Sequence, residues 1–374
     1  MKIGVPRETK VHEYRVGLTP ESVRELVSSG HTLLVERRAG EGIGAGDEEY
    51  ARAGARIAAT PDEIFAQSEL VVKVKEPLAP ERAMLRSGQT LFTYLHLAPD
   101  PVQARELLAS GAIAIAYETV TSPQGGLPLL APMSVVAGRM SIQIAAHFLE
   151  RPHGGRGILL SGAPGVDPGR VLVLGAGTAG SAACLIGLGL GGEVCVLDRS
   201  EAALRRLASA AGPRLRAKPM SPQTLAAELS SADAVIGAAL VPGATAPKLV
   251  TRRMLATMKP GAVLVDISID QGGCFETSHP TTHLDPSYTI DGIVHYCVAN
   301  IPGAVPRTST YALNHATLPF VSKLASGVRR ALTDDAALRD GLNVCAGTIT
   351  CRPVAESLGL AYEDPLLALA RCSG

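Results

Sequence analysis

A short glycine-rich segment carries the clearest chemical signal in the sequence. Residues 171–180 read VLVLGAGTAG, so that an apolar run precedes Gly175, Gly177 and Gly180 in the spacing G-x-G-x-x-G. Gly175 permits a tight turn, Gly177 lets backbone N–H groups approach a pyrophosphate, and Gly180 lets a helix pack closely on a strand. An acid, Asp198, ends the next apolar run. The pattern predicts a dinucleotide-binding βαβ unit.

Asp198 also bears on which dinucleotide is bound. A carboxylate at this place hydrogen-bonds the adenine-ribose 2′-hydroxyl of NAD and repels the 2′-phosphate of NADP. We therefore expect NAD as the cofactor. Arg199, the next residue, could contact a 2′-phosphate, so use of NADP stays open. The alternative interpretation of the glycine pattern is an ordinary βαβ turn without a ligand.

Four polar residues could act on the second reactant, because the dinucleotide supplies only the hydride chemistry. Arg15 precedes an apparent helix start, where a guanidinium could bind a carboxylate through two hydrogen bonds. Lys75 and His96 each follow an apolar run, and open α/β sheets bind ligands at the carboxyl ends of their strands. A histidine suits proton transfer near neutrality. Asp270 follows a run in the nucleotide half and would face the nicotinamide.

Each of these four residues also has a purely structural interpretation. Arg15 could be a surface arginine, and Lys75 a solvated lysine at the end of a strand. His96 could be a hydrogen-bonded structural histidine, and Asp270 could cap a turn. Considered one residue at a time, the sequence leaves these alternatives open.

Alternating strand-like and helix-like runs would position these residues. Such alternation in the first third of the chain predicts a parallel α/β unit. A long helix is expected at 133–150, then a Gly/Pro-rich loop at 152–169, and the chain beyond about residue 307 reads as helical, beginning around 309–327. Strands are expected at 2–5, 32–36, 70–74, 90–94, 113–116, 171–174, 193–198, 234–237, 263–269, 287–290 and 293–298, and further helices at 20–29, 61–67 and 181–190.

The predicted fold class is α/β with two domains. A chain of 374 residues can hold two domains of ordinary size, each with its own core. We expect a Rossmann-type doubly wound NAD domain at residues 129–306. A C-terminal helix that returns to the first domain would make the other one, an α/β substrate domain, discontinuous, with residues 1–128 and 307–374.

Composition argues against several kinds of partner. The 35 basic and 35 acidic residues cancel, which offers no electrostatic argument for nucleic acid or an anionic membrane. The first residues lack an apolar signal core, and no run reaches the ~18 apolar residues of a membrane span, so we expect a cytoplasmic protein. No C-x-x-C pair occurs, which favours reduced, buried thiols over disulfides or zinc. The cysteines are at positions 184, 195, 274, 297, 345, 351 and 372.

Seven segments, spread over nearly the whole chain, together resemble one known family. They are residues 4–10 (GVPRETK), 13–20 (EYRVGLTP), 74–77 (VKEP), 93–97 (TYLHL), 132–141 (PMSVVAGRMS), 270–278 (DQGGCFETS) and 295–303 (HYCVANIPG). These segments resemble those of alanine dehydrogenases. The related α subunit of the proton-translocating nicotinamide nucleotide transhydrogenase is similar in fold and glycine turn. Its pattern lacks the combination of His96 and Asp270.

The resemblance implies reversible NAD-dependent oxidative deamination of L-alanine to pyruvate and ammonia, in a homohexamer. Arg15 and Lys75 would bind the substrate carboxylate and carbonyl oxygen. His96 and Asp270 would handle protons.

The resemblance also implies an NAD site. Met133 would lean against the nicotinamide ring, and Asn300 would lie near its carboxamide. The other residues lining NAD would be Ser134, Gly175, Gly177, Thr178, Ala179, Gly180, Asp198, Ala239, Leu240, Ile267, Ser268, Ile269, Asp270, Val298, Ala299 and Ile301.

Three positions depart from the family pattern. Ala203 and Met220 stand where a basic residue and a serine are common, so adenosine contacts at these two places are in doubt. Some members bind magnesium through a glutamate and a later histidine. Glu118 matches the glutamate, but Gly327 stands in place of the histidine, so we expect no metal and a structural role for Glu118.

A rival hypothesis is a transhydrogenase-like module that exchanges hydride between cofactors while docked on a membrane proton pump. Such a module would need no amino-acid site, whereas an amino-acid enzyme requires Lys75, His96 and Asp270. Substrate breadth stays open, because one methylene changes binding by only ~1–3 kcal/mol, and serine or glyoxylate could be accepted.

Overall fold

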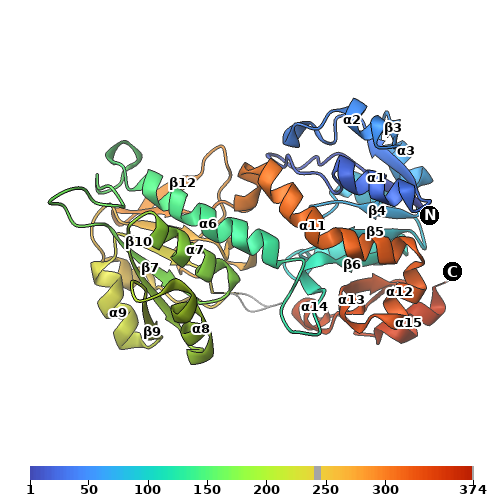
Figure 1. Ribbon diagram of the computed structural model, residues 1–374. Helices are drawn as coiled ribbons and strands as arrows, with labels where there is room; N and C mark the ends of the chain where they lie inside the picture. The colour runs from blue at the N-terminus through green and yellow to red at the C-terminus, as the bar shows by residue number, and fades with distance from the viewer. Residues whose placement is uncertain (240–245, 373–374) are drawn as a thin grey trace. The chain divides into compact units, whose positions relative to one another are not determined.

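The computed structural model describes residues 1–239 and 246–372, which form two compact units (Figure 1). Unit 1 comprises residues 1–133 together with the chain from 303 onward, and unit 2 comprises residues 134–302. Each unit has a largely parallel sheet with helices, so the predicted two-domain α/β class is confirmed. The expected borders, 128/129 and 306/307, differ from these by a few residues.

The sheet of unit 1 has eight strands in the order β15-β14-β6-β5-β4-β1-β2-β3. The six strands from β6 to β3 are parallel, and β14 and β15 run antiparallel at one edge. The chain builds β1, β2 and β3 on one side and then crosses to β4, so the winding reverses between β1 and β4. The strands are β1 (Lys2–Val5), β2 (Thr32–Glu36), β3 (Arg56–Ala58), β4 (Leu70–Val72), β5 (Thr90–Thr93), β6 (Ile113–Ala116), β14 (Leu342–Cys345) and β15 (Thr348–Ile349).

The helices of unit 1 come from both parts of the chain. One apolar core of this unit joins buried residues of β4, β5 and β6 to residues of the C-terminal segment, including Val344 and Val354. The helices are α1 (Pro20–Ser28), α2 (Asp47–Arg52), α3 (Pro61–Gln67), α4 (Ala79–Met84), α5 (Pro101–Ser110), α11 (Pro306–Ala325), α12 (Val328–Asp334), α13 (Ala336–Arg339), α14 (Arg352–Leu358) and α15 (Pro365–Arg371).

The sheet of unit 2 has seven strands in the order β12-β13-β11-β10-β7-β8-β9, all parallel except the edge strand β12. The chain builds β7, β8 and β9 outward and then crosses to β10, so the winding reverses between β7 and β10. The strands are β7 (Arg170–Leu174), β8 (Glu193–Asp198), β9 (Arg216–Pro219), β10 (Ala234–Gly237), β11 (Val263–Asp266), β12 (Ser287–Ile290) and β13 (Ile293–Tyr296).

Helices cover both faces of this second sheet. Residues of α6, α7 and α8 share one apolar core with strand residues such as Val173, and residues of α9 share another with strand residues such as Leu172. Because these two residues are consecutive in β7, their side chains point to opposite faces. The helices are α6 (Ala131–Phe148), whose first turn belongs to unit 1, α7 (Thr178–Gly189), α8 (Glu201–Ala211), α9 (Pro222–Ser231) and α10 (Arg252–Leu255).

Several helices start with the same local signal. In α1, α3, α5 and α9 a Thr, Asp or Ser side chain accepts a backbone N–H of the first turn, and proline takes the first helical position. These caps satisfy donors that a helix start leaves free, and proline has no N–H to lose there. This explains why the starts predicted at Pro20 and Pro61 are confirmed.

Four strands end earlier than predicted, and the prediction for the C-terminal segment was wrong in part. The strands β4, β5, β11 and β13 stop at Val72, Thr93, Asp266 and Tyr296 instead of at 74, 94, 269 and 298. The segment beyond 307 is not all helical, because it adds β14 and β15. The strand β14 pairs with β6, more than two hundred residues away, and β15 then pairs with β14. Local periodicity gives no sign of the distant pairing between β14 and β6.

The structure has all seven cysteines free, six of them buried and Cys372 partly exposed; Cys345 Sγ and Cys372 Sγ lie 2.7 Å apart. Within residues 1–239 and 246–372, no helix combines the length and apolar character needed to cross a membrane.

Candidate active site

The winding reversal of unit 1 gathers charged side chains at the carboxyl ends of β1 and β4. Open α/β sheets bind ligands at such switch points, because the two loops leave in opposite directions and open a crevice. The loop after β1 contributes Glu8, Glu13 and Arg15, and the loop after β4 contributes Lys73 and Lys75. All five side chains are buried, with relative exposures of 8% or less.

A buried ion cluster holds the loop that carries Lys75. Lys73 Nζ lies 2.6 Å from Glu81 Oε1 and 3.2 Å from Glu8 Oε2. Burial alone lowers the pKa of Lys73, but the two carboxylates raise it, so the ammonium stays charged. The Oε1 atom of Glu8 accepts the backbone N–H groups of Val74 and Lys75 at 2.7 and 3.3 Å. Glu8 therefore joins β1 to the loop that ends in Lys75.

Arg15 is held by a second buried carboxylate. Its Nε and Nη2 atoms donate to Oε1 and Oε2 of Glu13 at 2.7 and 2.5 Å, and its Nη1 lies 3.1 Å from Met133 Sδ. Burial lowers the pKa of Arg15, and Glu13 raises it further than burial lowers it. Arg15 also lines a cavity of about 260 Å³ together with Glu8, Lys10 and Glu13. The surface-arginine interpretation of Arg15 was wrong.

His96 follows β5 in a backbone conformation that is rare outside glycine. Its φ is +48°, in the left-handed region, which costs energy and persists only where surrounding contacts impose it. Glu118 Oε1 supplies that contact by accepting the backbone N–H of His96 at 2.6 Å and of Leu95 at 3.1 Å. The imidazole is 26% exposed, stacks on the Tyr94 ring at 5.8 Å, and has its Nδ1 3.9 Å from Glu118 Oε1.

Glu76 indicates that Lys75 and His96 lie close together. Burial by itself raises the pKa of the Glu76 carboxyl, but the charges of Lys75, His96 and Lys10 lower it to about 2. Lys10 Nζ also donates to Glu76 Oε1. The three predicted residues of unit 1, Arg15, Lys75 and His96, thus occupy one end of one sheet.

Sequence reasoning missed the residues that hold this cluster. Glu8, Glu13, Lys73 and Glu76 were not singled out. One signal was available for Lys73, because a lysine within the apolar run LVVKV must be paired if that run is buried. Glu8 gave no signal as a partner of Lys73, since it lies 65 residues away in the sequence.

The glycine turn of unit 2 has the close approaches that its spacing predicts. Gly175 has φ +113°, and a Cβ there would lie 2.7 Å from the Ala238 carbonyl oxygen of the neighbouring strand end. A Cβ at Gly180 would lie 1.8 Å from the Gly175 carbonyl oxygen. Gly177 precedes α7 with open space around its Cβ position. The turn can therefore present backbone N–H groups at the N-terminus of α7 to an anion.

Asp198, at the end of β8, braces this turn. Its Oδ2 accepts the backbone N–H of Ala176 at 2.6 Å, and its Oδ1 accepts that of Ser200 at 2.7 Å. The residue is only partly buried, and each oxygen keeps a lone pair for a further donor. Thr178 is exposed and Ala179 partly buried beside it.

Asp270 is exposed in a 3₁₀ turn (Ile269–Gln271), four residues beyond the end of β11. The strand stops at Asp266, whose buried carboxylate accepts backbone N–H groups of Ser268 and Cys274 and the hydroxyl of Ser278. The capping role proposed as the alternative for Asp270 is thus filled by Asp266. Extension of the strand to 269 was wrong because Asp266 turns the chain.

The remaining residues of the predicted NAD site lie in three short segments of unit 2 and at the start of α6. Asn300 has φ +84° and, like Val298 and Ile301, is buried after β13. The Ser268 hydroxyl donates to the Ala239 carbonyl oxygen at 2.7 Å. Met133 and Ser134 lie in the first turn of α6, Ile267, Ser268 and Ile269 follow β11, and Ala299 lies between Val298 and Asn300, while Leu240 lies outside the described residues.

The positions that depart from the family pattern have local structural contacts. The Ala203 N–H donates to the capping Ser200 hydroxyl, and the Met220 N–H donates to the Asp198 carbonyl oxygen at 2.9 Å. Gly327 has φ +141° before α12 and carries no side chain that could act as a ligand.

Comparisons with known proteins agree across the whole chain. Residues 4–137 match the family model "Alanine dehydrogenase/PNT, N-terminal domain", and residues 141–352 match "Alanine dehydrogenase/PNT, C-terminal domain". A protein of Halomonas elongata named alanine dehydrogenase is 56% identical over 365 residues, which cover 97% of this chain and 98% of the relative.

Two solved structures extend this likeness to the fold. An L-alanine dehydrogenase superposes with a TM-score of 0.91 at 47% identity, covering 96% of this chain and 99% of the other. A transhydrogenase from Sinorhizobium meliloti has a TM-score of 0.79 at 25% identity, covering 94% and 99%. The chain therefore belongs to the alanine dehydrogenase/PNT family.

Proposed function

We propose that this protein is an alanine dehydrogenase that reversibly oxidises L-alanine with NAD and water to pyruvate, ammonium, NADH and a proton. The observation that carries the proposal is the position of Arg15, Lys75 and His96 after β1, β4 and β5 at one end of the unit 1 sheet, within a chain of this family. Two cations suit a substrate with a carboxylate and a carbonyl, and an imidazole suits proton transfer.

The residues of unit 2 fit a bound NAD. Gly175 and Gly180 allow the close backbone contacts of the turn, and Asp198 can accept a ribose hydroxyl without losing its two backbone donors. The Oε1 atom of Gln271, beside Asp270, is buried without a hydrogen-bond partner among the described residues. When bound, NAD would accept the hydride from the substrate α-carbon. The fit supports NAD over NADP, because Asp198 would repel a 2′-phosphate.

Each polar residue then has a definite task. Arg15, pinned by Glu13, would hold the substrate carboxylate, and Lys75 would donate to the carbonyl oxygen and stabilise negative charge there during amination. His96 would remove the proton that the amine must lose, because an ammonium group has no lone pair to form the imine. Asp270 would assist the addition of water. Glu118 would act through His96, by fixing its backbone.

The finer assignments are also proposals. The remaining NAD contacts would be those of Met133, Ser134, Thr178, Ala179, Ala239, Leu240, Ile267 to Asp270 and Val298 to Ile301. The resemblance supports a cytoplasmic homohexamer that needs no membrane or nucleic-acid partner.

A transhydrogenase-like exchange of hydride between cofactors is the second candidate. The structural likeness to the Sinorhizobium meliloti protein supports it. The buried pair of Arg15 and Glu13 and the partly exposed His96, with its positive φ, favour the amino-acid enzyme, since a reaction between two cofactors requires no carboxylate or proton site. Mixing the protein with NAD and L-alanine at mildly alkaline pH should raise NADH absorbance. Absence of a rise with alanine or any small amino acid would contradict the proposal.

Asp270→Asn tests the chemical role of the second proton-handling residue. The change keeps shape and hydrogen-bonding capacity but removes the charge. NADH binding, followed by fluorescence titration, should change little, while alanine oxidation and pyruvate amination should fall together in kcat and kcat/KM. Because Asp270 is exposed, the variant should fold normally. Wild-type rates in both directions would remove Asp270 from the mechanism and leave His96 alone.

A further inference from the structure

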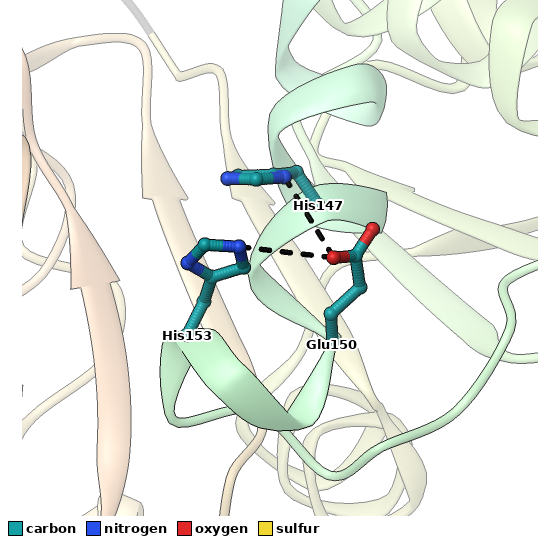
Figure 2. Close-up of side chains that lie close together, drawn as sticks. All are labelled: His147, Glu150 and His153. Atoms are coloured by element: carbon teal, nitrogen blue, oxygen red, sulfur yellow. Dashed lines mark ion pairs between the residues drawn. The ribbon is translucent and has the colours of Figure 1, made fainter.

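Three metal-ligating side chains gather on the surface of unit 2 (Figure 2). His147 lies in the last turn of α6, Glu150 follows it by three residues, and His153 ends the next 3₁₀ turn (Arg151–His153). One carboxylate oxygen, Oε2 of Glu150, lies 4.0 Å from His147 Nδ1 and 3.7 Å from His153 Nε2. A donor atom from each residue lies within 4.8 Å of the other two.

A buried aromatic residue orients the two imidazoles. Phe148 contacts His147 and His153 edge to face, with ring centroids 5.2 and 5.8 Å apart, and packs on Tyr296 of β13 at 5.5 Å. The two imidazole rings lie 3.9 Å apart. At that distance two protonated rings would repel each other, whereas two neutral rings could share one cation.

The backbone between these side chains is fixed as well. The N–H groups of Glu150 and His153 donate to the carbonyl oxygens of His147 and Glu150 at 3.1 and 3.2 Å, and Gly155 N–H also donates to Glu150. A Cβ at Gly155 would lie 2.2 Å from the Phe148 carbonyl oxygen, so the chain returns tightly onto the end of α6. The C-terminal end of this 18-residue helix carries partial negative charge, which favours a cation.

We propose that His147, Glu150 and His153 bind one divalent transition-metal ion, with Zn²⁺ as the best fit and water completing the coordination. Two imidazole nitrogens and a carboxylate oxygen suit zinc, whereas Mg²⁺ and Ca²⁺ require oxygen ligands. Tetrahedral zinc with ligands at ~2.1 Å would space them by about 3.4 Å. Small side-chain rotations would bring the three donor atoms from their present spacing to that value. The ion would tie the 3₁₀ turn to the end of α6.

The test is a calorimetric titration of Zn²⁺ into the full-length, chelator-treated protein. Cys372 is replaced by serine in every sample, because its thiol, beside Cys345, is a second group that zinc could reach. One equivalent should bind per chain, and the thermal unfolding midpoint should rise with zinc, since an ion bound only to the folded state stabilises it. Mg²⁺ should give neither effect.

Two variants and a matched control decide the outcome. Glu150→Gln and the double change His147→Ala/His153→Ala should each weaken zinc binding by about tenfold or more and abolish the thermal shift. His315→Ala removes an exposed histidine of α11 and should behave like the parent. With Co²⁺ in place of zinc, the parent should show a d–d absorption band without a sulfur charge-transfer band. Equal zinc affinity in all variants, or no binding by the parent, would overturn the proposal.

Discussion

The two units share the same order of six parallel strands and place different kinds of groups at its switch point. In each, the winding reverses beside the first strand, between β1 and β4 in unit 1 and between β7 and β10 in unit 2. Unit 1 fills this place with buried, paired charges such as Lys73 and Arg15. Unit 2 has glycines and backbone N–H groups at its switch point, in a turn that Asp198 braces. One fold thus offers either a side-chain site or a backbone cradle at its switch point.

Because unit 1 places side chains at the site, we expect the largest effect on turnover from a substitution there. His96→Ala should lower turnover by about 10²–10⁴-fold, because general acid–base catalysis typically contributes that much. NADH binding should be largely unchanged, since the imidazole is proposed to act on the substrate. The measurement is steady-state alanine oxidation beside NADH fluorescence titration. Near-normal turnover would exclude His96 as the proton-transfer group.

The next effect concerns the stability of the charge cluster. Lys73→Met leaves Glu8 and Glu81 buried without their cation, and removing one partner of a buried ion pair typically costs about 3–5 kcal/mol. Urea denaturation monitored by circular dichroism would measure the free energy of unfolding.

Unit 2 offers a matched comparison for Lys73. Lys259→Met removes a cation that lies 2.9 Å from Asp233 but is 31% exposed, so the loss should stay below about 1 kcal/mol. If both variants lose a similar free energy of unfolding, the buried cluster of unit 1 contributes no more to stability than an exposed ion pair does.

The difference between the units also explains what could be predicted from the sequence. The glycine turn could be predicted because its function depends on the backbone, which requires Gly175, Gly177 and Gly180 at fixed spacing on one continuous segment. The charged cluster of unit 1 could be predicted only in part. Arg15, Lys75 and His96 were found as strand-end and loop residues. The contacts of Lys75 with Glu8 and of His96 with Glu118 depend on which strands are neighbours, whereas Glu13 lies only two residues from Arg15.

The fold shows the same division between local and distant information. The helix starts at Pro20 and Pro61 were predicted correctly, because a capping residue before proline is a signal contained in a few residues. The same signal precedes α5 and α9, which were not predicted. The strands β14 and β15 were missed, because β14 forms by pairing with the distant strand β6 and β15 by pairing with β14. The early end of β11 was missed since the apolar run continues to Ile269, and the turn depends on donors that reach Asp266 from residues 274 and 278.

Alanine substitutions at two glycines of α7 test whether unit 2 depends on close backbone packing. Gly180→Ala would place a Cβ 1.8 Å from the Gly175 carbonyl oxygen, so α7 must move away from β7. We expect a loss of stability of about 1–3 kcal/mol and weaker NADH binding. Gly189→Ala, in the same helix with open space around it, should be neutral or stabilise by up to about 1 kcal/mol. Equal behaviour of the two variants in denaturation and NADH titration would contradict the close-packing role of Gly180.

The smallest effect should come from Asp198, the carboxylate that braces the glycine turn of unit 2. Asp198→Asn keeps one acceptor for the backbone but removes the charge that would repel a 2′-phosphate, so NADP should gain on NAD by about tenfold while turnover at saturating NAD stays nearly constant. Asp198→Ala should weaken NAD more, because the N–H groups of Ala176 and Ser200 then lose their shared acceptor and the glycine turn loses its brace. Comparison of kcat/KM for both cofactors in the two variants separates these contributions. If the ratio of NAD to NADP use is unmoved in both, Asp198 only braces the turn, and unit 2 selects its cofactor without any side-chain charge.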